Sequence, residues 1–326
     1  AETVSPVQRL AHLTAELDAL HNDRLLVSPH VDKKQIAAVI AEWTGVPLNR
    51  LSQNEMSVIT DLPKWLGDTI KGQDMAIASL HKHLLTARAD LRRPGRPLGA
   101  FLLAGPSGVG KTETVLQLAE LLYGGRQYLT TINMSEFQEK HTVSRLIGSP
   151  PGYVGYGEGG VLTEAIRQKP YSVVLLDEVE KAHPDVFNIL LQILDDGRIT
   201  DSQGRTVDFK NTIIILTSNL GSQYLLEGIM PDGSISEEAQ SAVMHELKGA
   251  FRPEFLNRLD EVIMFRPLTR ENLGGIIDIM VEGLRKRLAD KGLSLELTDA
   301  AKDLIIARGY DPLYGARPLW RCLQSG

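Results

Sequence analysis

The first part of the chain carries apolar side chains at helical spacing. Between residues 6 and 22 they recur at intervals of three and four, at Val7, Leu10, Leu13, Leu17 and Leu20. This spacing predicts an amphipathic helix, and it fits both a helix packed on its own domain and a fragment of a coiled coil. A second helix is predicted over residues 32–43, because Asp32 is a good N-cap and Gly45 and Pro47 follow its end.

From about residue 98 the pattern changes to short apolar runs separated by helical stretches. The runs that we interpret as strands are residues 100–104, 128–133, 172–176, 212–217 and 261–265. Several are continuous β-branched or leucine runs without polar alternation, which is typical of strands covered on both faces. Because helices separate the strands, right-handed crossovers and a parallel sheet are expected. The pattern therefore predicts an α/β fold, with a parallel five-stranded sheet flanked by helices.

Beyond Pro267 the spacing of apolar residues becomes helical again. It predicts helices over residues 270–289, 299–307 and from 317 onward, and a short strand over residues 293–297. We therefore expect three units, namely a helical linker segment (1–60), a large α/β subdomain (61–267) and a smaller, mostly helical subdomain (268–326).

The composition describes an ordinary globular protein, with 43% hydrophobic and 23% charged residues among 326. The net charge of −6 argues against partners that need a basic surface, so we expect neither nucleic acid nor a membrane. No apolar run approaches the roughly 20 residues that span a bilayer. The single cysteine, Cys322, excludes an internal disulfide framework and fits a reducing compartment, which we expect to be the cytoplasm. The chain starts at Ala1 without an initiator Met, which suggests a piece of a longer protein.

A candidate phosphate loop follows the first predicted strand. The letters GPSGVGKT match the P-loop pattern, at Gly105, Pro106, Ser107, Gly108, Val109, Gly110, Lys111 and Thr112. An apolar strand leads into the loop and an amphipathic helix leaves it, so backbone N–H groups and the helix N-terminus can hold a phosphate. Lys111 is placed to reach the β- and γ-phosphates of a nucleotide, and the Thr112 hydroxyl to bind Mg²⁺. A glycine turn that merely precedes a helix would not require this order of elements.

Two acids stand at the end of the third predicted strand. Asp177 and Glu178 follow the apolar run VVLL, and the carboxyl ends of parallel strands form the ligand-binding edge of an α/β sheet. Alone, such a pair is most often a solvated turn. Beside a P-loop it is typical of a site where Asp177 acts on Mg²⁺ and Glu178 activates water. Asn219, after the fourth strand, either orients the same water or caps a turn.

Two arginines are ambiguous on spacing alone. Arg258 precedes the last predicted strand, and Arg317 lies in the helical subdomain. Residues at such positions are most often surface residues or ion-pair partners, and only a comparison with a family assigns them a role in a nucleotide site.

Six sequence blocks resemble the second ATPase domain of Clp-family unfoldases of the AAA+ class, and most closely that of the ClpB-type protein disaggregases. They are GPSGVGKTET, the segment around GYVGYGEGG, VLLDEVEKAHPDVF, TSNLGS, FRPEFLNRLDE and GYDPLYGARPL. The resemblance runs from about Ile36 to the end of the chain. It implies an AAA+ P-loop NTPase fold with a helical C-terminal lid. We expect that lid to be shortened, because the chain ends nine residues after Arg317.

The resemblance implies a role for each residue of the nucleotide site. Lys111 and Thr112 match the Walker A pair, Asp177 and Glu178 match the Walker B pair, and Asn219 matches the first sensor. Thr112 and Asp177 are then the Mg²⁺ ligands, and ATP is the nucleotide.

Four further residues take roles from the same resemblance. Arg258 matches the arginine finger that touches the nucleotide of a neighbouring subunit, and Arg252 supports it. Arg317 matches the second sensor on the lid, and Ile70 leads the stretch beside the adenine. Because an arginine finger needs a neighbour, the resemblance implies a ring of identical subunits, which is a hexamer in this family.

The segment GYVG places Tyr153 and Val154 in the pore loop of these unfoldases, where they would grip a threaded chain. Prolines and glycines surround the segment, as is typical of an exposed loop. A second, polar loop over residues 201–205 is expected to face the same channel.

The implied function is ATP-driven unfolding and translocation of proteins through a ring pore, which rescues aggregated proteins. Its partners are unfolded or aggregated substrates, with co-chaperones as further candidates. Two alternatives stay open, an unfoldase subunit that feeds a peptidase and another AAA+ remodelling ATPase. Between Leu220 and Gly249 the chain lacks the aliphatic–Gly–Phe/Leu tripeptide of peptidase-docking relatives, which favours the disaggregase.

Overall fold

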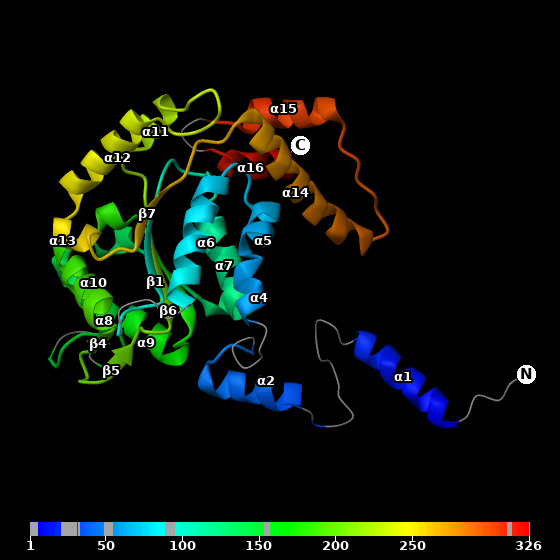
Figure 1. Cartoon of the computed structure of the whole chain (residues 1–326), viewed down its shortest axis with the longest axis horizontal. Coiled ribbons are helices and arrows are strands. Elements are labelled where there is room, and N and C mark those ends of the chain that lie inside the picture. Colours follow the sequence, from blue (N-terminus) through cyan, green and yellow to red (C-terminus); the bar gives the residue numbers. More distant parts are fainter. Residues whose placement is uncertain are drawn as a thin grey trace, which may run out of the picture.

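A parallel β-sheet lies at the centre of the protein, whose computed structural model describes residues 6–20, 31, 33–48, 55–88, 95–152, 157–311 and 315–325. The strand order is β2-β3-β6-β1-β7, and every pairing is parallel (Figure 1). The strands are β1 (Gly99–Ala104), β2 (Leu129–Asn133), β3 (Ser172–Asp177), β6 (Thr212–Ser218) and β7 (Glu261–Met264). The predicted sheet is confirmed, with each strand bounded within one residue of its expected ends.

Both faces of the sheet are covered, and alternate residues of each strand enter two separate cores. Phe101 and Leu103 of β1 belong to one core, and Ala100 and Leu102 belong to the other. Every residue of β1 and β6 is buried. This is the arrangement that continuous apolar runs require, because no polar alternation remains to face water.

A layer of helices closes each core. The first core is closed by α5 (Leu62–Thr69), α6 (Asp74–Arg88) and α7 (Lys111–Tyr123). The second is closed by α8 (Lys140–Ile147), α9 (Val161–Gln168), α10 (Pro184–Asp196), α11 (Ser222–Glu227), α12 (Glu237–Ala250) and α13 (Pro253–Leu256). Figure 1 shows α5, α6 and α7 on one side of the strands and α10, α12 and α13 on the other.

A helical subdomain follows β7 and shares the first core. Its helices are α14 (Arg270–Ala289), α15 (Asp299–Gly309) and α16 (Arg317–Ser325). A capping box between Thr269 and Asn272 starts α14. Leu273, Ile277 and Val281 form the buried stripe of this helix, so α14 is attached to the sheet layer through side chains at intervals of four.

The predicted strand over residues 293–297 is wrong. The segment has no regular structure and pairs with no strand of the described part of the chain. Leu295 O instead accepts a hydrogen bond from Arg285 Nε at 2.8 Å. Leu295 and Leu297 pack against the core while Leu293 is exposed. The alternation thus marks which side chains are buried, whereas a strand also needs a backbone partner.

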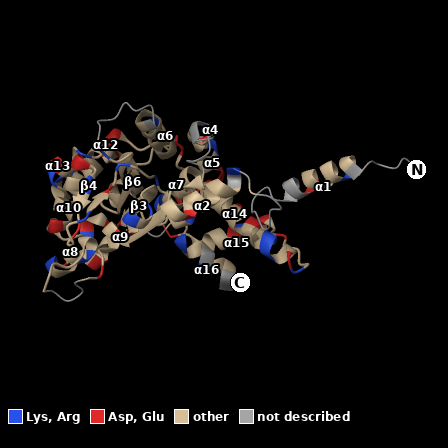
Figure 2. Ribbon diagram, turned by 90° about the horizontal axis from the view of Figure 1, so that it is seen from below, with Lys and Arg blue, Asp and Glu red and all other residues tan. Residues whose placement is uncertain are grey.

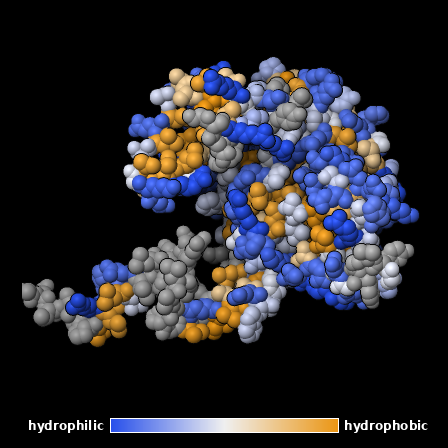
Figure 3. All heavy atoms as spheres, turned by 180° about the vertical axis from the view of Figure 1, so that it is seen from behind, coloured by the Kyte–Doolittle hydropathy of each residue, from blue (hydrophilic) through white to orange (hydrophobic). Residues whose placement is uncertain are grey.

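Three helices precede the sheet, namely α1 (Pro6–Leu20), α2 (Lys33–Thr44) and α4 (Glu55–Thr60). The two predicted N-terminal helices are confirmed, although Asp32, the expected N-cap, lies outside the described residues. α1 extends away from the α/β body (Figure 1), and its Val7, Leu10 and Leu13 are exposed. Figure 3 shows apolar atoms at the surface of both α1 and α2. Val7, Leu10 and Leu13 of α1 therefore do not contribute to the two described cores.

A short hairpin that the pattern did not predict lies beside α9. It pairs β4 (Arg198–Thr200) with β5 (Thr206–Asp208) in antiparallel fashion. Positions of Lys and Arg are interspersed with positions of Asp and Glu along the ribbon (Figure 2). None of the helices that the structure describes has the length and apolarity to cross a bilayer.

Candidate nucleotide site

The carboxyl ends of β1, β3 and β6 meet at one edge of the sheet. Ala104 of β1 lies opposite Ser218 of β6, and Leu176 of β3 lies opposite Leu216 of the same strand. The residues that follow these strands are the P-loop, the acid pair and Asn219. Parallel pairing therefore brings together three segments that are distant in the sequence, at the edge where open α/β sheets bind ligands.

The phosphate loop has a backbone that only glycine adopts readily. Gly105, Gly108 and Gly110 all have positive φ, at 155°, 72° and 108°. A Cβ at Gly105 would lie 2.7 Å from Phe265 O, so this position also needs the absence of a side chain. Gly110 is the N-cap of α7 and Lys111 its first residue. The loop thus ends at a helix N-terminus, whose free N–H groups attract phosphate.

Lys111 is buried, with 8% of its surface exposed, and it bridges two segments of the site. Its Nζ donates to Gly105 O at 2.6 Å and Pro106 O at 2.7 Å. It also donates to Asn219 Oδ1 at 3.1 Å. The predicted Walker A lysine and the predicted first sensor are therefore in direct contact, and Asn219 faces the phosphate loop.

Burial lowers the pKa of Lys111 from its usual 10.5 to about 8. Desolvation disfavours the charged ammonium, and the positive charge of Arg317 lowers the pKa further. The carboxylates of Asp177 and Glu180 offset part of the effect. Nearby carboxylates therefore compensate the positive charge of the Lys111 ammonium only in part. A bound anion would supply the remaining negative charge.

Asp177 and Glu178 are held by a buried hydroxyl that sequence analysis missed. Thr217 Oγ1 donates to Asp177 Oδ1, and the same oxygen accepts a hydrogen bond from Glu178 N at 3.2 Å. Thr217 is 1% exposed. Its place on β6, next to β3, could have indicated the contact, because the polar residue interrupts an otherwise apolar run directly before Ser218 and Asn219.

Glu178 has an unusual backbone conformation. Its φ of 56° is the one positive value at a non-glycine residue in the described ranges. Such a conformation costs on the order of 1–3 kcal/mol and occurs most often at functional sites. The carboxylate reaches Lys181 Nζ at 2.5 Å, and both side chains are partly exposed. The turn after β3 thus directs Glu178 into the cavity beside the P-loop.

A cavity of about 460 Å³ joins the sheet edge to the helical subdomain. Its walls include the predicted residues Ile70, Ser107, Gly108, Val109, Gly110, Lys111, Thr112, Asp177, Glu178, Asn219 and Arg317. Seven other wall residues were not among the predicted site residues, namely Thr69, Lys71, Glu113, Ile276, Ile279, Met280 and Ala316. Residues 276, 279 and 280 form one face of α14 at intervals of three and four, so helical spacing was the available signal.

The lid touches the phosphate loop through backbone atoms. Ala316 N donates to Gly108 O at 3.1 Å. Gly315 has a φ of 58°, and a Cβ there would lie 2.6 Å from Gly108 O. The segment that carries Arg317 is therefore docked on the P-loop, and Arg317, although exposed to solvent, lines the same cavity.

A buried glutamine joins the phosphate loop to the segment after β7. Gln73 is 1% exposed, and its Nε2 donates to Val109 O at 3.2 Å and Arg266 O at 2.8 Å. Its Oε1 accepts from Arg266 N at 2.9 Å. The adjacent Ile70 is buried and faces Gly110. These contacts fix the stretch that the resemblance places beside the adenine.

Thr112 and Asp177 both line the cavity, as expected for Mg²⁺ ligands. A hydroxyl and a carboxylate are oxygen donors of the kind that Mg²⁺ prefers. In the described part of the chain, no group of three or more His, Cys, Asp or Glu side chains forms a metal cage. Mg²⁺ is commonly held by one or two protein oxygens together with substrate phosphates and water.

Several predicted site residues lie elsewhere. Arg258 does not line the cavity and forms an ion pair with Asp195 of α10. Arg252 donates to Asn188 of the same helix at 3.0 Å. The two arginines therefore lie together on a face outside the cavity of their own chain. The predicted pore residues Tyr153 and Val154 lie outside the described residues.

Comparison with known families agrees with this geometry. Residues 96–262 match the AAA domain (Cdc48 subfamily), and residues 268–326 match the C-terminal, D2-small domain of ClpB protein. The chain belongs to the AAA family. Its α/β part is thus an AAA ATPase domain, a nucleotide-binding unit, and its lid is of the ClpB type.

Curated relatives and a solved structure resemble this AAA chain over most of its length. It is 54% identical to the chaperone protein ClpB of Bacillus cereus over 312 residues, which are 95% of this chain and 36% of that protein. It is 54% identical to ClpB of Meiothermus ruber over 91% of this chain and 35% of that protein. A closed-state cryo-EM reconstruction of Hsp104 with ATPγS and FITC-casein has a TM-score of 0.78 and 40% identity, covering 90% of this chain and 51% of that one. The chain spans about a third of the length of these curated relatives.

The contact between lid and P-loop predicts the effect of Gly315→Ala. A Cβ would collide with Gly108 O and strain the positive φ, so the lid should move off the loop. We expect nucleotide affinity to fall by about tenfold, which corresponds to strain on the order of 1–2 kcal/mol. Titration with a fluorescent nucleotide measures the change. Gly274→Ala on α14, where a Cβ meets nothing within 4 Å, is the control. Unchanged affinity for Gly315→Ala would contradict the docking.

The lowered pKa of Lys111 predicts that nucleotide affinity depends on pH. Above about pH 8 the free protein loses the Lys111 proton, whereas nucleotide phosphates are already ionised. The dissociation constant should therefore stay level between pH 6.5 and 7.5 and rise above pH 8, approaching about tenfold per pH unit. Equilibrium binding from pH 6.5 to 9.5 checks this, and Lys64→Met, outside the cavity, should give the same curve. A constant affinity up to pH 9.5 would show that Lys111 stays charged.

Proposed function

We propose that this chain is the second ATPase domain of a ClpB-type disaggregase, which uses ATP and Mg²⁺ to pull unfolded or aggregated proteins through a hexameric ring. The observation that carries the proposal is the single cavity that unites the P-loop, the acid pair, Asn219 and the lid arginine. The identity of 54% to ClpB proteins over most of the chain supports it.

Each residue of the proposed site has its own chemical role. Lys111 and the N-terminus of α7 hold the phosphates, and Thr112 and Asp177 hold Mg²⁺, which neutralises phosphate charge when it is bound. Glu178 accepts a proton from the attacking water as general base. Asn219, already bonded to Lys111, orients that water near the γ-phosphate.

The position of Arg258 supports hydrolysis that depends on a neighbour. The side chain does not line its own cavity, and it is 41% exposed beside Asp195. A cation on an outer face can complete the active site of the next subunit, where it stabilises charge in the transition state. Such a contact joins two different surfaces, and repeated contacts of this kind close into a ring. We therefore propose Arg258 as the arginine finger, with Arg252 beside it.

Threading is assigned to the segment around Tyr153 and Val154. In a hexamer these residues would line the axis and grip an extended chain through apolar contacts that tolerate many sequences. The Hsp104 reconstruction contains casein, and by analogy we propose unfolded and aggregated proteins as substrates, with co-chaperones as additional partners. We place the protein in the cytoplasm, and we propose neither nucleic acid nor a membrane as a partner.

Mixing two inactive variants tests the role of Arg258. Arg258→Ala alone should lose hydrolysis on the order of 10³-fold, and Glu178→Gln alone should bind ATP without turning it over. In a mixture, an Arg258→Ala site beside a Glu178→Gln neighbour has both its own base and a donated arginine. The ATPase rate should recover to roughly a quarter of the wild-type rate at equal amounts, from random placement in a ring. The double variant mixed with Arg258→Ala should give no recovery. Absence of recovery in both mixtures would exclude an arginine finger at this position.

Reactivation of an aggregated reporter enzyme tests the function itself. In the full-length protein, Tyr153→Ala should keep the ATPase rate within about twofold and lose reactivation, because hydrolysis and grip reside in different segments. Tyr153→Phe, which keeps the aromatic ring, should retain both activities. Glu178→Gln should lose both. If the wild type hydrolyses ATP but reactivates nothing, the disaggregase assignment is wrong. If Tyr153→Ala reactivates normally, the pore assignment is wrong.

A further inference from the structure

The turn between β4 and β5 is folded around a buried carboxylate. Asp201 N donates to Arg205 O at 2.9 Å, and Gly204 N donates to Asp201 O at 3.0 Å. The side chain turns inward, where Oδ1 accepts from Gln203 N at 2.9 Å and Arg205 N at 2.8 Å. Only 2% of the Asp201 side chain is exposed. The Asp201 side chain therefore points into the protein, and the expectation that the loop over residues 201–205 faces a channel stays a prediction.

Asp201 also joins the turn to α9. Its Oδ2 accepts from Arg167 Nη2 at 2.7 Å and Arg205 Nε at 2.9 Å. Both arginines then donate to Glu164 Oε1, at 2.7 Å and 2.9 Å. Two acids and two arginines thus form a closed ring of charge-assisted hydrogen bonds, which we call the 164–205 cluster. Bonds of this kind are about twice as strong as neutral ones.

The charges of the 164–205 cluster compensate one another. Burial would raise the pKa of Asp201, but hydrogen bonds from Arg205 and Gln203 and the charge of Arg205 lower it below its ordinary value. Asp201 therefore stays ionised at neutral pH. Removing its charge would leave two arginines facing Glu164 alone. This would loosen the arrangement, while the side chains of Arg167, Glu164 and Arg205, which are 31–43% exposed, stay solvated.

The same turn contacts the base of the candidate pore segment on its other side. Ser202 N donates to Ile147 O at 3.0 Å. A Cβ at Gly148 would lie 2.3 Å from Ser202 Oγ, so Gly148 packs closely against the Ser202 side chain. Gly148 in turn forms an antiparallel bridge with Gly159, two residues before α9 begins. The turn 201–205 therefore contacts one end of the segment that contains Tyr153 and Val154, and the bridge from Gly148 to Gly159 connects this contact to the other end.

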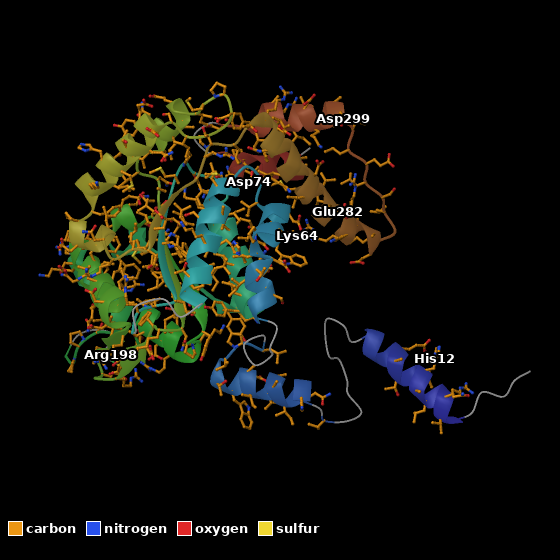
Figure 4. The ribbon with its side chains drawn as sticks, viewed as in Figure 1. His12, Lys64, Asp74, Arg198, Glu282 and Asp299 are labelled. Atoms are coloured by element: carbon orange, nitrogen blue, oxygen red, sulfur yellow. The ribbon has the colours of Figure 1, made fainter. Side chains whose placement is uncertain are left out.

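These contacts lie far from the lid. Arg198, at the start of β4, is at the opposite side of the molecule from the lid residues Glu282 and Asp299 (Figure 4). None of the four residues of the 164–205 cluster lines the nucleotide cavity. A change in the cluster can therefore alter the two loops without touching the groups that bind or cleave ATP.

We infer that Asp201 is a positioning residue that locks the turn 201–205 and the base of the 148–160 segment into one unit, so that both loops move together on substrate. The inference rests on the proposed threading function. In this arrangement the turn does not grip substrate with Asp201. It supports the neighbouring loop, and α9 carries any displacement of that loop toward β3, which begins four residues after α9 ends.

The test replaces Asp201→Asn in the full-length protein, with Asp208→Asn as the matched control. Asp208 lies on the same hairpin, is exposed, and accepts one hydrogen bond, from Lys210 N. Both asparagines keep a side-chain acceptor for the backbone, but only Asp201→Asn removes a charge from the cluster. We expect basal ATPase and thermal midpoint to stay near wild type, and unfolding of a fluorescent substrate to fall about fivefold or more for Asp201→Asn only.

Amide hydrogen exchange provides a readout that does not depend on threading. Asp201→Asn should speed exchange within 148–152 and 157–160, segments remote in sequence from the substitution, and Asp208→Asn should not. Arg167→Gln removes the direct bond from α9 to Asp201 and leaves the turn's own bonds to Asp201 and the Arg205–Glu164 pair, and it should reproduce both effects. If the Asp201→Asn protein does not fold, the Arg167→Gln protein is used in its place.

The outcomes separate this inference from the proposed function. Wild-type exchange and wild-type unfolding rates in both Asp201→Asn and Arg167→Gln would overturn the role of the cluster. Faster exchange with unfolding rates unchanged would overturn the positioning role while leaving the contacts in place. If the wild-type protein unfolds no substrate at all, the proposed function fails, and the exchange data alone decide whether the two loops are locked.

Discussion

Parallel pairing of β3, β6 and β1 places three chemically different segments at one edge of the sheet, and the nucleotide site depends on that pairing. The register sets Ala104 opposite Ser218, so the phosphate loop and Asn219 begin side by side. Lys111 then connects them by donating to both. A shift of one residue in this register would exchange the side chains that enter the two cores. The two cores on either face of the sheet therefore stabilise the geometry of the site as well as the fold.

Two buried charges perform similar structural work in different parts of the molecule. Lys111 joins the P-loop to the end of β6, and Asp201 joins a hairpin turn to α9. Each charge is costly to remove from water, and each is stabilised by several directed hydrogen bonds. The two charges differ in how completely the protein itself compensates them. The Asp201 carboxylate is fully occupied by protein donors, whereas the Lys111 ammonium keeps a lowered pKa and favours an added anion. The first arrangement suits a rigid support and the second suits a binding site.

The lid and the α/β domain line the candidate nucleotide cavity together, so the ClpB-type small domain would contact a nucleotide bound there. Its contribution is a backbone bond from Ala316 to Gly108 and an apolar wall from α14. Arg258 lies on an outer face, beside Asp195. In the proposed ring, a subunit would thus offer a nearly complete site to its own nucleotide and one arginine to its neighbour's. Hydrolysis would then report whether the neighbour is in place.

Local sequence determined the strands, most helices, the phosphate loop and the acid pair, because each depends on spacing and residue type within a short stretch. The strand over residues 293–297 was wrongly predicted, since alternation reports burial and cannot supply a backbone partner. The sequence pattern also did not predict the hydrogen bonds of Thr217 or the burial of the Asp201 side chain. Their roles come from neighbours 40 and 34 residues away in the chain, and only packing brings those neighbours into reach. What the sequence by itself determined is the set of groups able to bind a nucleotide. The tertiary structure alone decided which of them meet, because hydrogen bonds and ion pairs act over a few ångströms and the fold sets those distances.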